Sequence, residues 1–350
     1  MKKRVFVIVL CMMLLALPLV GCGGGEGGSS RQLRVFIWGD FIDEELVKDF
    51  EAETGITINF TYFDSNEMMM AKIAGGDKYD LCFPSDYAVE KMKMLDQLAE
   101  IDHSKIENLA NIDESFLGHA FDAENKYSIP YMWGTVGILY NKDLVDGPID
   151  SWEALFDKKY AGKVIMYDSV RDSFVPAMRY LGYDINSTNP DEIKAAEDLL
   201  YQQNKEDGIV RSYLIDEAKG AMVTGNYALN LTYSGDAVIA MEEADFLDYV
   251  VPKEGSNIWF DNVSILKTCE DMDAAHEFIN FLCDAEVAAA NAEYVGYSTP
   301  NKAAVELLPQ ELLDNPVFNP SQDVIDRCKV FVDLGDAMKI YNDAWLRIRS

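Results

Sequence analysis

The sequence predicts an α/β protein with two lobes. Its 350 residues exceed the size of one typical domain. Segments with the pattern of strands alternate with segments with the pattern of helices at intervals of roughly 20–30 residues, as in sheets with many parallel strand pairs. Hydrophobic residues make up 49% of the chain, enough for two packed cores.

The first third of the chain contains three strand segments. Asp43 can cap the helix that follows the first of them, and Gly55 can end that helix. The segment after Gly55 alternates apolar and polar residues, which predicts a half-buried strand. The predicted strands cover 33–38, 56–62 and 80–83, and the predicted helices cover 43–54 and 65–74.

A second series of strand and helix segments follows residue 134. The predicted strands cover 164–167, 228–233 and 249–252, and the predicted helices cover 191–204, 274–283 and 334–349. We expect segments near 134–139 and 258–263 to cross between the lobes. We expect the helices after Asn301 to pack back on the second lobe.

The N-terminus has the layout of a secretory signal. Basic residues at positions 2–4 precede an apolar run of 16 residues, Val5–Val20, which ends at Gly21 and Cys22. The run is short for a transmembrane helix, which is the alternative interpretation. The order of residues resembles the lipobox of bacterial lipoproteins. That resemblance implies a signal over 1–21, a lipid on Cys22, a Gly/Ser tether over 22–30, and an extracytoplasmic protein anchored to a bacterial membrane.

The charge of the chain excludes some partners. Sixty acidic residues stand against 27 basic residues once the signal is removed, a net charge of −33. Nucleic acid is excluded because its phosphates require basic residues. Most acidic side chains of such a chain form a solvated surface, and their field attracts cations.

No motif for catalysis, a metal or a nucleotide is complete. Gly23, Gly25 and Gly28 have the spacing of a dinucleotide-binding turn but follow no strand, and Asn226 stands where a P-loop requires Lys. We therefore expect no cofactor, no metal site and no catalytic residue. Of the cysteines outside the signal and lipid site, Cys82 lies in an apolar strand and is expected to be a buried free thiol. Spacing cannot assign a disulfide among the other three, which are Cys269, Cys283 and Cys328.

Aromatic and acidic residues cluster after four predicted strands and on one crossing segment. These clusters are 38–41, 85–87, 168–172, 233–236 and 259–261. Ligands of open α/β sheets bind beyond the carboxyl ends of strands. A ring face attracts a cation by roughly 0.5–2 kcal/mol, and a carboxylate hydrogen-bonded to an ammonium adds roughly 1.5–3 kcal/mol. The clusters predict a ligand that carries positive charge on an apolar body.

These clusters belong to a wider resemblance over nearly the whole mature chain. The sequence resembles the spermidine/putrescine-binding lipoproteins of ABC transporters in the segments 38–41, 53–56, 64–67, 79–85, 128–134, 252–255, 259–261 and 296–301. The resemblance implies the two-lobed periplasmic-binding-protein fold of type II, in which each lobe is a mixed sheet flanked by helices. Lobe 1 would hold 31–136 and 262–301, and lobe 2 would hold 137–261 and 302–350, with the ligand cleft between them.

The resemblance also implies which residues bind the ligand, a linear polyamine boxed by aromatic rings and held at its nitrogens by acids. The aromatic positions are Trp38, Tyr87, Tyr233, Trp259 and Tyr297, and Ser85 stands at a hydroxyl contact. The acidic positions are Asp172 at a terminal amine, Asp261 at the centre, Asp40 and Asp236, which match the putrescine-preferring branch, and Asp86, which is additional.

The chain departs from the family pattern at three of these positions. Tyr233 replaces a Trp, Ser169 replaces a second Asp of one branch, and Phe331 replaces a Gln of spermidine binders. The choice between putrescine and spermidine stays open.

We expect a monomer that captures a polyamine by cleft closure and delivers it to the permease subunits of an ABC importer. Two alternatives are open. A binding protein for a sugar or another solute would carry amides and Arg in its cleft. An extracellular hydrolase would use two facing carboxylates as acid and base.

Overall fold

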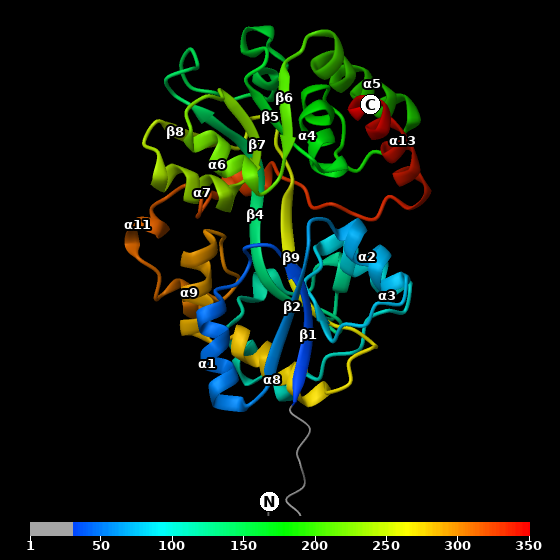
Figure 1. The fold of residues 1–350 in the computed structure, drawn as a ribbon, viewed down its shortest axis with the longest axis vertical. Coiled ribbons are helices and arrows are strands. Elements are labelled where there is room, and N and C mark those ends of the chain that lie inside the picture. Colours follow the sequence, from blue (N-terminus) through cyan, green and yellow to red (C-terminus); the bar gives the residue numbers. More distant parts are fainter. Residues whose placement is uncertain (1–30) are drawn as a thin grey trace, which may run out of the picture.

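The computed structural model describes residues 31–350, which form two lobes joined by long strands (Figure 1). The strands are β1 (Gln32–Trp38), β2 (Thr57–Phe63), β3 (Leu81–Cys82), β4 (Ile129–Asn141), β5 (Val164–Tyr167), β6 (Val210–Leu214), β7 (Leu229–Tyr233), β8 (Leu247–Val250) and β9 (Ile258–Ile265). They are connected in the order β2-β1-β3-β9-β4-β7-β5-β6, with β8 paired to β4. The predicted two-lobed α/β architecture is confirmed. The predicted signal, the lipidated Cys22 and the tether lie outside the described residues.

The lower lobe in Figure 1 is built on β1, which pairs in parallel with β2 and β3. Its helices are α1 (Glu44–Thr54), α2 (Asn66–Ala74), α3 (Asp86–Met94), α8 (Met272–Leu282) and α9 (Ala285–Val295). The predicted ends of α1 are confirmed: the Asp43 side chain accepts from the backbone N–H of Glu45, and Gly55 ends the helix with a φ of 70°. Cys82 is a buried free thiol, as predicted, and the other three cysteines among residues 31–350 are also unpaired.

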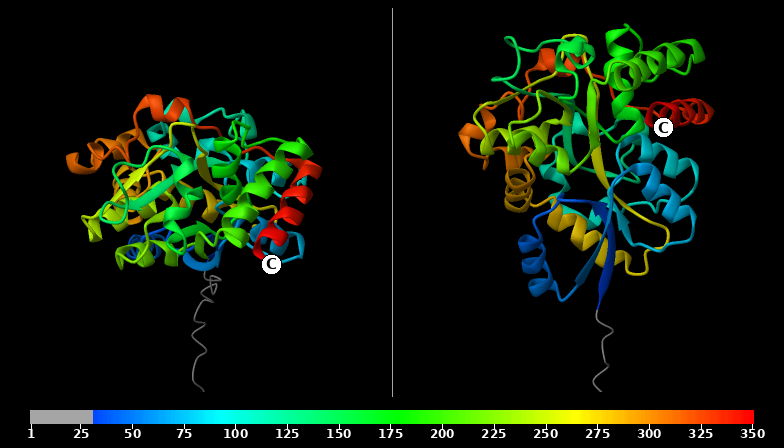
Figure 2. Two further views of the ribbon diagram at one scale, coloured as in Figure 1. Left: turned by 90° about the horizontal axis from the view of Figure 1, so that it is seen from above. Right: turned by 45° about the horizontal axis from the view of Figure 1, so that its top comes forward.

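The upper lobe is built on β5, which pairs in parallel with β6 and β7. Its helices are α4 (Val170–Tyr180), α5 (Pro190–Tyr201), α6 (Glu217–Val223) and α7 (Ser234–Glu243). The C-terminal helix α13 (Met338–Arg349) packs against α4 and α5, as the red and green helices of Figure 2 show. Arg347 of α13 donates to both carboxylate oxygens of Glu197 on α5, at 2.6 and 2.8 Å.

The strands β4 and β9 run from one lobe into the other, where the sequence predicts crossing segments. They pair with each other antiparallel; β9 also pairs with β3, and the second half of β4 pairs with β7 and β8. Every residue of both strands is buried. Each lobe therefore has a mixed sheet, because parallel pairs from the strand–helix units join antiparallel pairs made by β4 and β9.

Two expectations about elements are wrong. The helix α10 (Lys302–Val305) packs against α9 of the lower lobe, although we expected all helices after Asn301 on the second lobe. The strand β8 ends at Val250, before the predicted end at 252. The sequence analysis also predicts no helix at α3, α4, α6, α7 or α9 and no strand at β6. Gly235 in the first turn of α7 lowers its helix propensity, so packing decides that helix.

A partly buried ion pair connects β1 to Asp80, the residue before β3. Arg34 donates from Nε and Nη2 to the two carboxylate oxygens of Asp80, at 2.8 and 2.7 Å, and the Asp80 side chain is only 3% exposed. Two backbone N–H groups, those of Arg34 and Glu270, also donate to Asp80. Burial of the carboxyl raises the pKa of Asp80, but these donors outweigh it and hold the pKa below its usual range.

Arg34→Met is expected to reduce the free energy of unfolding at pH 7 by about 2 kcal/mol, because it leaves a buried carboxylate with fewer donors. The pKa of Asp80 is lowered in the folded state, so this contribution is present above the carboxyl's unfolded pKa and is lost as pH falls through the folded one. Urea unfolding at pH 7 and pH 3 measures both effects. The control is Arg31→Met, whose pair with Asp271 is half exposed and should be worth less than about 1 kcal/mol. If the two variants lost the same free energy of unfolding, the larger contribution of the Arg34–Asp80 pair would be contradicted.

Candidate functional site

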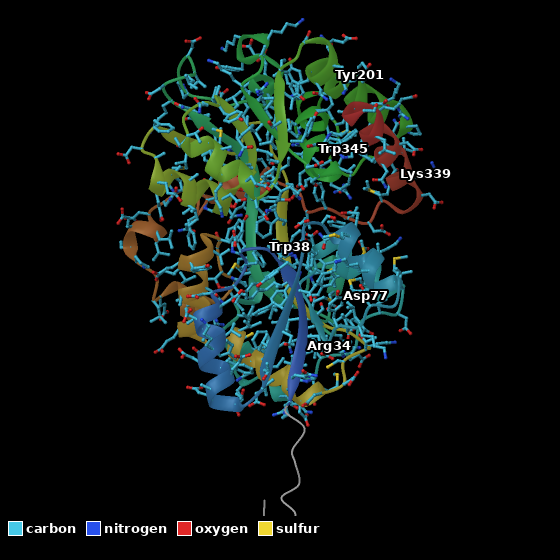
Figure 3. The ribbon with its side chains drawn as sticks, viewed as in Figure 1. Arg34, Trp38, Asp77, Tyr201, Lys339 and Trp345 are labelled. Carbon is cyan, nitrogen blue, oxygen red and sulfur yellow. The ribbon has the colours of Figure 1, made fainter. Side chains whose placement is uncertain are left out.

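A cavity lies between the lobes and encloses about 1080 Å³, part of it open to solvent. Its walls come from the segments that follow β1, β2 and β3 in one lobe and β5, β6 and β7 in the other, together with β9. Figure 3 shows Trp38 at the end of β1, at the level where the lobes meet. All eleven residues predicted as ligand contacts line this cavity: Trp38, Asp40, Ser85, Asp86, Tyr87, Asp172, Tyr233, Asp236, Trp259, Asp261 and Tyr297.

Aromatic rings form a continuous row along one wall. The ring centroids of Tyr167 and Tyr233 are 4.7 Å apart, those of Tyr233 and Trp259 are 5.8 Å apart, and those of Trp259 and Tyr297 are 4.9 Å apart. The last two pairs meet edge to face, which favours a fixed arrangement. Gly235 makes room for this row, because a Cβ there would lie 2.2 Å from Cδ1 of Tyr297.

Asp261 lines the cavity and accepts a hydrogen bond from one hydroxyl group. Ser85 Oγ donates to Asp261 Oδ1 at 2.5 Å, and Asn66 fixes Ser85 by donating to its Oγ and accepting from its backbone N–H. The Asp261 side chain is buried, and its position on β9 is set by the antiparallel pairing with β4. The pKa of Asp261 is raised to about 8, mainly by burial and also by the charges of Asp86 and Asp172.

Asp86 differs from Asp261 because its two oxygens are engaged by the backbone. Oδ1 accepts from the N–H of Tyr87 at 2.7 Å, and Oδ2 accepts from the N–H of Phe260 at 3.1 Å. This carboxylate therefore joins the start of α3 to β9. Burial raises its pKa to about 7.

Asp172 and Asp236 lie in the first turns of α4 and α7, where the helix dipole favours negative charge. Asp172 accepts from Ser169 Oγ at 2.6 Å and from the Tyr233 hydroxyl at 2.8 Å. Asp236 accepts from the Tyr167 hydroxyl at 2.8 Å. Burial raises the pKa of both carboxyls. Asp40 lies across the cavity, at its rim, with its side chain 74% exposed.

Comparison with known proteins identifies the family. The family of bacterial extracellular solute-binding proteins matches residues 45–319. The chain belongs to this family. It is 33% identical over 334 residues to the spermidine/putrescine-binding periplasmic protein of Escherichia coli, and the match covers 95% of each chain.

Solved structures agree with this assignment. A candidate spermidine/putrescine ABC transporter from Listeria monocytogenes is 42% identical, with a TM-score of 0.88 over 91% of this chain and 99% of that one. The TpPotD lipoprotein of Treponema pallidum is 27% identical, with a TM-score of 0.81 over 91% and 99% of the two chains. The expected two-lobed binding-protein fold is confirmed. No helix within 31–350 has the length and apolar character to span a membrane.

Sequence reasoning assigned no role to five further residues that line the cavity of this solute-binding protein: Asn66, Glu67, Arg171, Asp216 and Lys219. Only Asn66 and Glu67 lie in a segment that carries the family resemblance. Arg171 is buried, and its donors are used by Val332 O and Asn186 Oδ1 at 3.1 and 2.8 Å. Its guanidinium carbon lies 4.1 Å from the ring centroid of Phe331. Altogether eight carboxylates and two cations line the cavity. The carboxylates are those of the five predicted acids together with Asp64, Glu67 and Asp216, and the cations are Arg171 and Lys219.

Asp261→Asn is expected to stabilise the unliganded solute-binding protein at pH 8. Asp261 keeps its proton up to about pH 8 in the folded state but loses it near its ordinary pKa in the unfolded chain. The folded state then binds more protons between these values, and stability falls as pH rises. The amide carries no charge and can still accept from Ser85. We therefore expect a gain on the order of 1 kcal/mol or more at pH 8, and a smaller one at pH 5, in urea unfolding.

The control is Asp77→Asn, which removes the same charge from an exposed position outside the cavity (Figure 3). Its stability should stay within about 0.5 kcal/mol of the parent. If Asp261→Asn gave the same gain at pH 5 and pH 8, the raised pKa would be wrong.

Proposed function

We propose that this protein captures a polyamine outside the cytoplasm and delivers it to an ABC importer. The observation that carries the proposal is the charge of the cavity, in which eight carboxylates face two cations along a row of aromatic rings. A polyamine supplies the missing ammonium groups and covers the rings with its methylenes. The name of the E. coli relative supports the same ligand class.

The buried carboxylates favour a ligand with separated positive charges. Burial raises the pKa values of Asp86, Asp172 and Asp261. The charge of Asp172 also contributes to the raised pKa values of Asp86 and Asp261. Such carboxyls cannot all be ionised without a countercharge nearby. Ammonium groups spaced along a flexible amine can reach several of them at once.

A neutral sugar fits the cavity less well. The Arg171 fork already donates to the protein, and the Asn66 amide donates to Ser85 and Tyr87. These Arg and amide donors are therefore engaged by the protein, whereas eight carboxylates line the cavity as acceptors. Membership in a solute-binding family also supports binding without catalysis over the hydrolase alternative.

The proposal also includes closure of the two lobes on the ligand and attachment of the protein to the membrane by a lipid. The lobes would have the predicted bounds except at α10, which packs on the lower lobe. They would move about the crossing segments of β4 and β9, and a ligand that contacts both lobes would favour the closed form. A lipid on Cys22 and the Gly/Ser tether would keep this monomer near the permease. The lipoprotein nature of the Treponema pallidum relative supports that anchor.

Calorimetry with putrescine, spermidine, spermine and glucose tests the ligand class. We expect heat with at least one amine and none with glucose. Asp261→Asn should weaken amine binding by about 2 kcal/mol, roughly thirtyfold in Kd, because it removes a buried countercharge. Asp77→Asn should leave Kd within about threefold. Binding of glucose alone, or hydrolysis of a glycoside, would refute the proposal.

Amine binding is expected to release protons near neutral pH. The pKa values of Asp86 and Asp261 are raised to about 7 and about 8, so these carboxyls hold protons that an ammonium must displace. Affinity should then fall as pH drops from 8 to 6, by up to about tenfold per pH unit for each proton released. Calorimetry at pH 7 in two buffers of different ionisation heat counts the protons. Asp261→Asn should release fewer, and a parent protein that released none would contradict the assignment.

A further inference from the structure

The side-chain amide of Asn66 lies between two hydroxyl groups of the cavity. Asn66 is the first residue of α2 and is only 4% exposed. Its carbonyl oxygen accepts from the backbone N–H of Ser85 at 3.1 Å, and the orientation of the amide is fixed because that N–H can only donate. The amide nitrogen therefore faces the hydroxyl groups, and it donates to Ser85 Oγ at 2.9 Å and to the Tyr87 hydroxyl at 3.2 Å.

This arrangement fixes the direction of the Ser85 hydroxyl proton. A hydroxyl group carries one proton, which cannot point toward an N–H group that donates to the same oxygen. The proton points instead at Asp261 Oδ1, which lies 2.5 Å from Ser85 Oγ. Tyr87 repeats the pattern, because it accepts from Asn66 and donates to Glu67 Oε1 at 3.1 Å. One amide thus directs two hydroxyl protons to two carboxylates.

The Ser85 hydroxyl serves Asp261 instead of the helix that begins beside it. Ser85 is the N-cap residue of α3, and a serine in that position normally accepts from a backbone N–H two or three residues further on. The Ser85 side chain makes no such bond. By contrast, Ser65 at the start of α2 accepts from the N–H of Met68 at 3.2 Å. The Ser85 hydroxyl is therefore withdrawn from capping and used in the contact with Asp261.

Asp261 depends on this single donor. Within residues 31–350, no Lys or Arg nitrogen lies within 4 Å of its carboxylate, and Ser85 is its only hydrogen-bond donor. The charged groups that face Asp261 are Asp86 at the start of α3 and Asp172 on α4, and both are acidic. A hydrogen bond donated to a carboxylate favours its charged form, whereas two neighbouring acids oppose that form.

We infer that Asn66 is a positioning residue for the binding of cations, because it directs the Ser85 hydroxyl proton to Asp261 and so maintains this carboxylate as an acceptor. The effect on a ligand rests on the proposed function, since an ammonium group can only donate and needs a charged carboxylate as its partner. The direction of the proton is a property of the protein without any ligand, so it can be tested separately.

Asn66→Leu tests the inference, because Leu has nearly the shape of Asn but neither its donor nor its acceptor. The measurement is the titration of the Asp261 carboxyl carbon by NMR in the unliganded protein, with the signal assigned by its absence in Asp261→Asn. We expect the midpoint to rise by about half a pH unit or more, which is an about threefold higher proton affinity. In Ser85→Ala, which has no hydroxyl to direct, the addition of Asn66→Leu should move the midpoint by less than about 0.2 pH units.

The matched control is Asn230→Leu, the same substitution at a buried Asn on β7 that does not line the cavity. The Asn230 amide has no hydrogen-bond partner among residues 31–350, so this variant should keep the midpoint within about 0.2 pH units of the parent. An unchanged midpoint in Asn66→Leu, or an equal rise with and without the Ser85 hydroxyl, overturns the inference. Should Asn66→Leu not fold in a thermal unfolding assay, Asn66→Ala gives the same comparison.

Calorimetry measures the consequence for binding, with whichever of putrescine and spermidine binds the parent more tightly. The Kd of Asn66→Leu should be about threefold higher than that of the parent at pH 7, where the Asp261 proton must be displaced, and less than about 1.5-fold higher at pH 9. The same Kd ratio at both pH values would indicate a structural role alone and overturn the inference. If the parent binds neither amine, the proposed function fails, and the NMR titration still decides the direction of the proton.

Discussion

Negative charge buried between the lobes is the constraint on which the rest of this structure depends. The strands that end at the cavity are followed by helices that begin there, so the positive ends of five helices converge on one space. Acidic residues occupy the first turns of several of them, including Glu67 on α2, Asp86 on α3, Asp172 on α4 and Asp236 on α7. Helix dipoles and hydroxyl donors stabilise these carboxylates in part. These dipoles and donors do not neutralise the carboxylates. The cavity therefore keeps a negative charge that a bound cation can neutralise.

The crossing strand β9 contributes a carboxylate to the cavity and also connects the two lobes. Alternate residues of a strand point to opposite faces, so Trp259 and Asp261 share one face and line the cavity. Phe260 between them faces the other way, where its ring lies 4.6 Å from that of His119. The same strand therefore contributes to the core of the lower lobe and to the binding wall. In the proposed function, a ligand that contacts β9 acts on the element that joins the lobes.

The sequence predicts those residues of the site that follow predicted strands. Trp38, Ser85 and Tyr233 stand at strand ends, and the carboxyl-end rule for α/β sheets places such residues together. Lys219 carries no comparable signal, because it lies on a short helix and its partner Asp40 is about 180 residues away in sequence. Asp216 does follow a strand, β6, but that strand is not among those predicted from the sequence. Only the pairing order of the strands brings α6 opposite the loop after β1. The helices α3 and α7 were missed for a related reason, since their packing rather than their periodicity determines them.

Burying carboxylates costs free energy, and this cost is reduced differently near Asp40 and Asp236 than near Asp261. Near Asp40 and Asp236 the protein supplies its own ammonium through Lys219, and the charge is compensated before any ligand arrives. Around Asp261 there is no such cation, and burial shifts the carboxyl toward its protonated form instead. Protonation is reversible, so a ligand ammonium can replace the proton. A resident lysine cannot leave the chain, so it can only move aside.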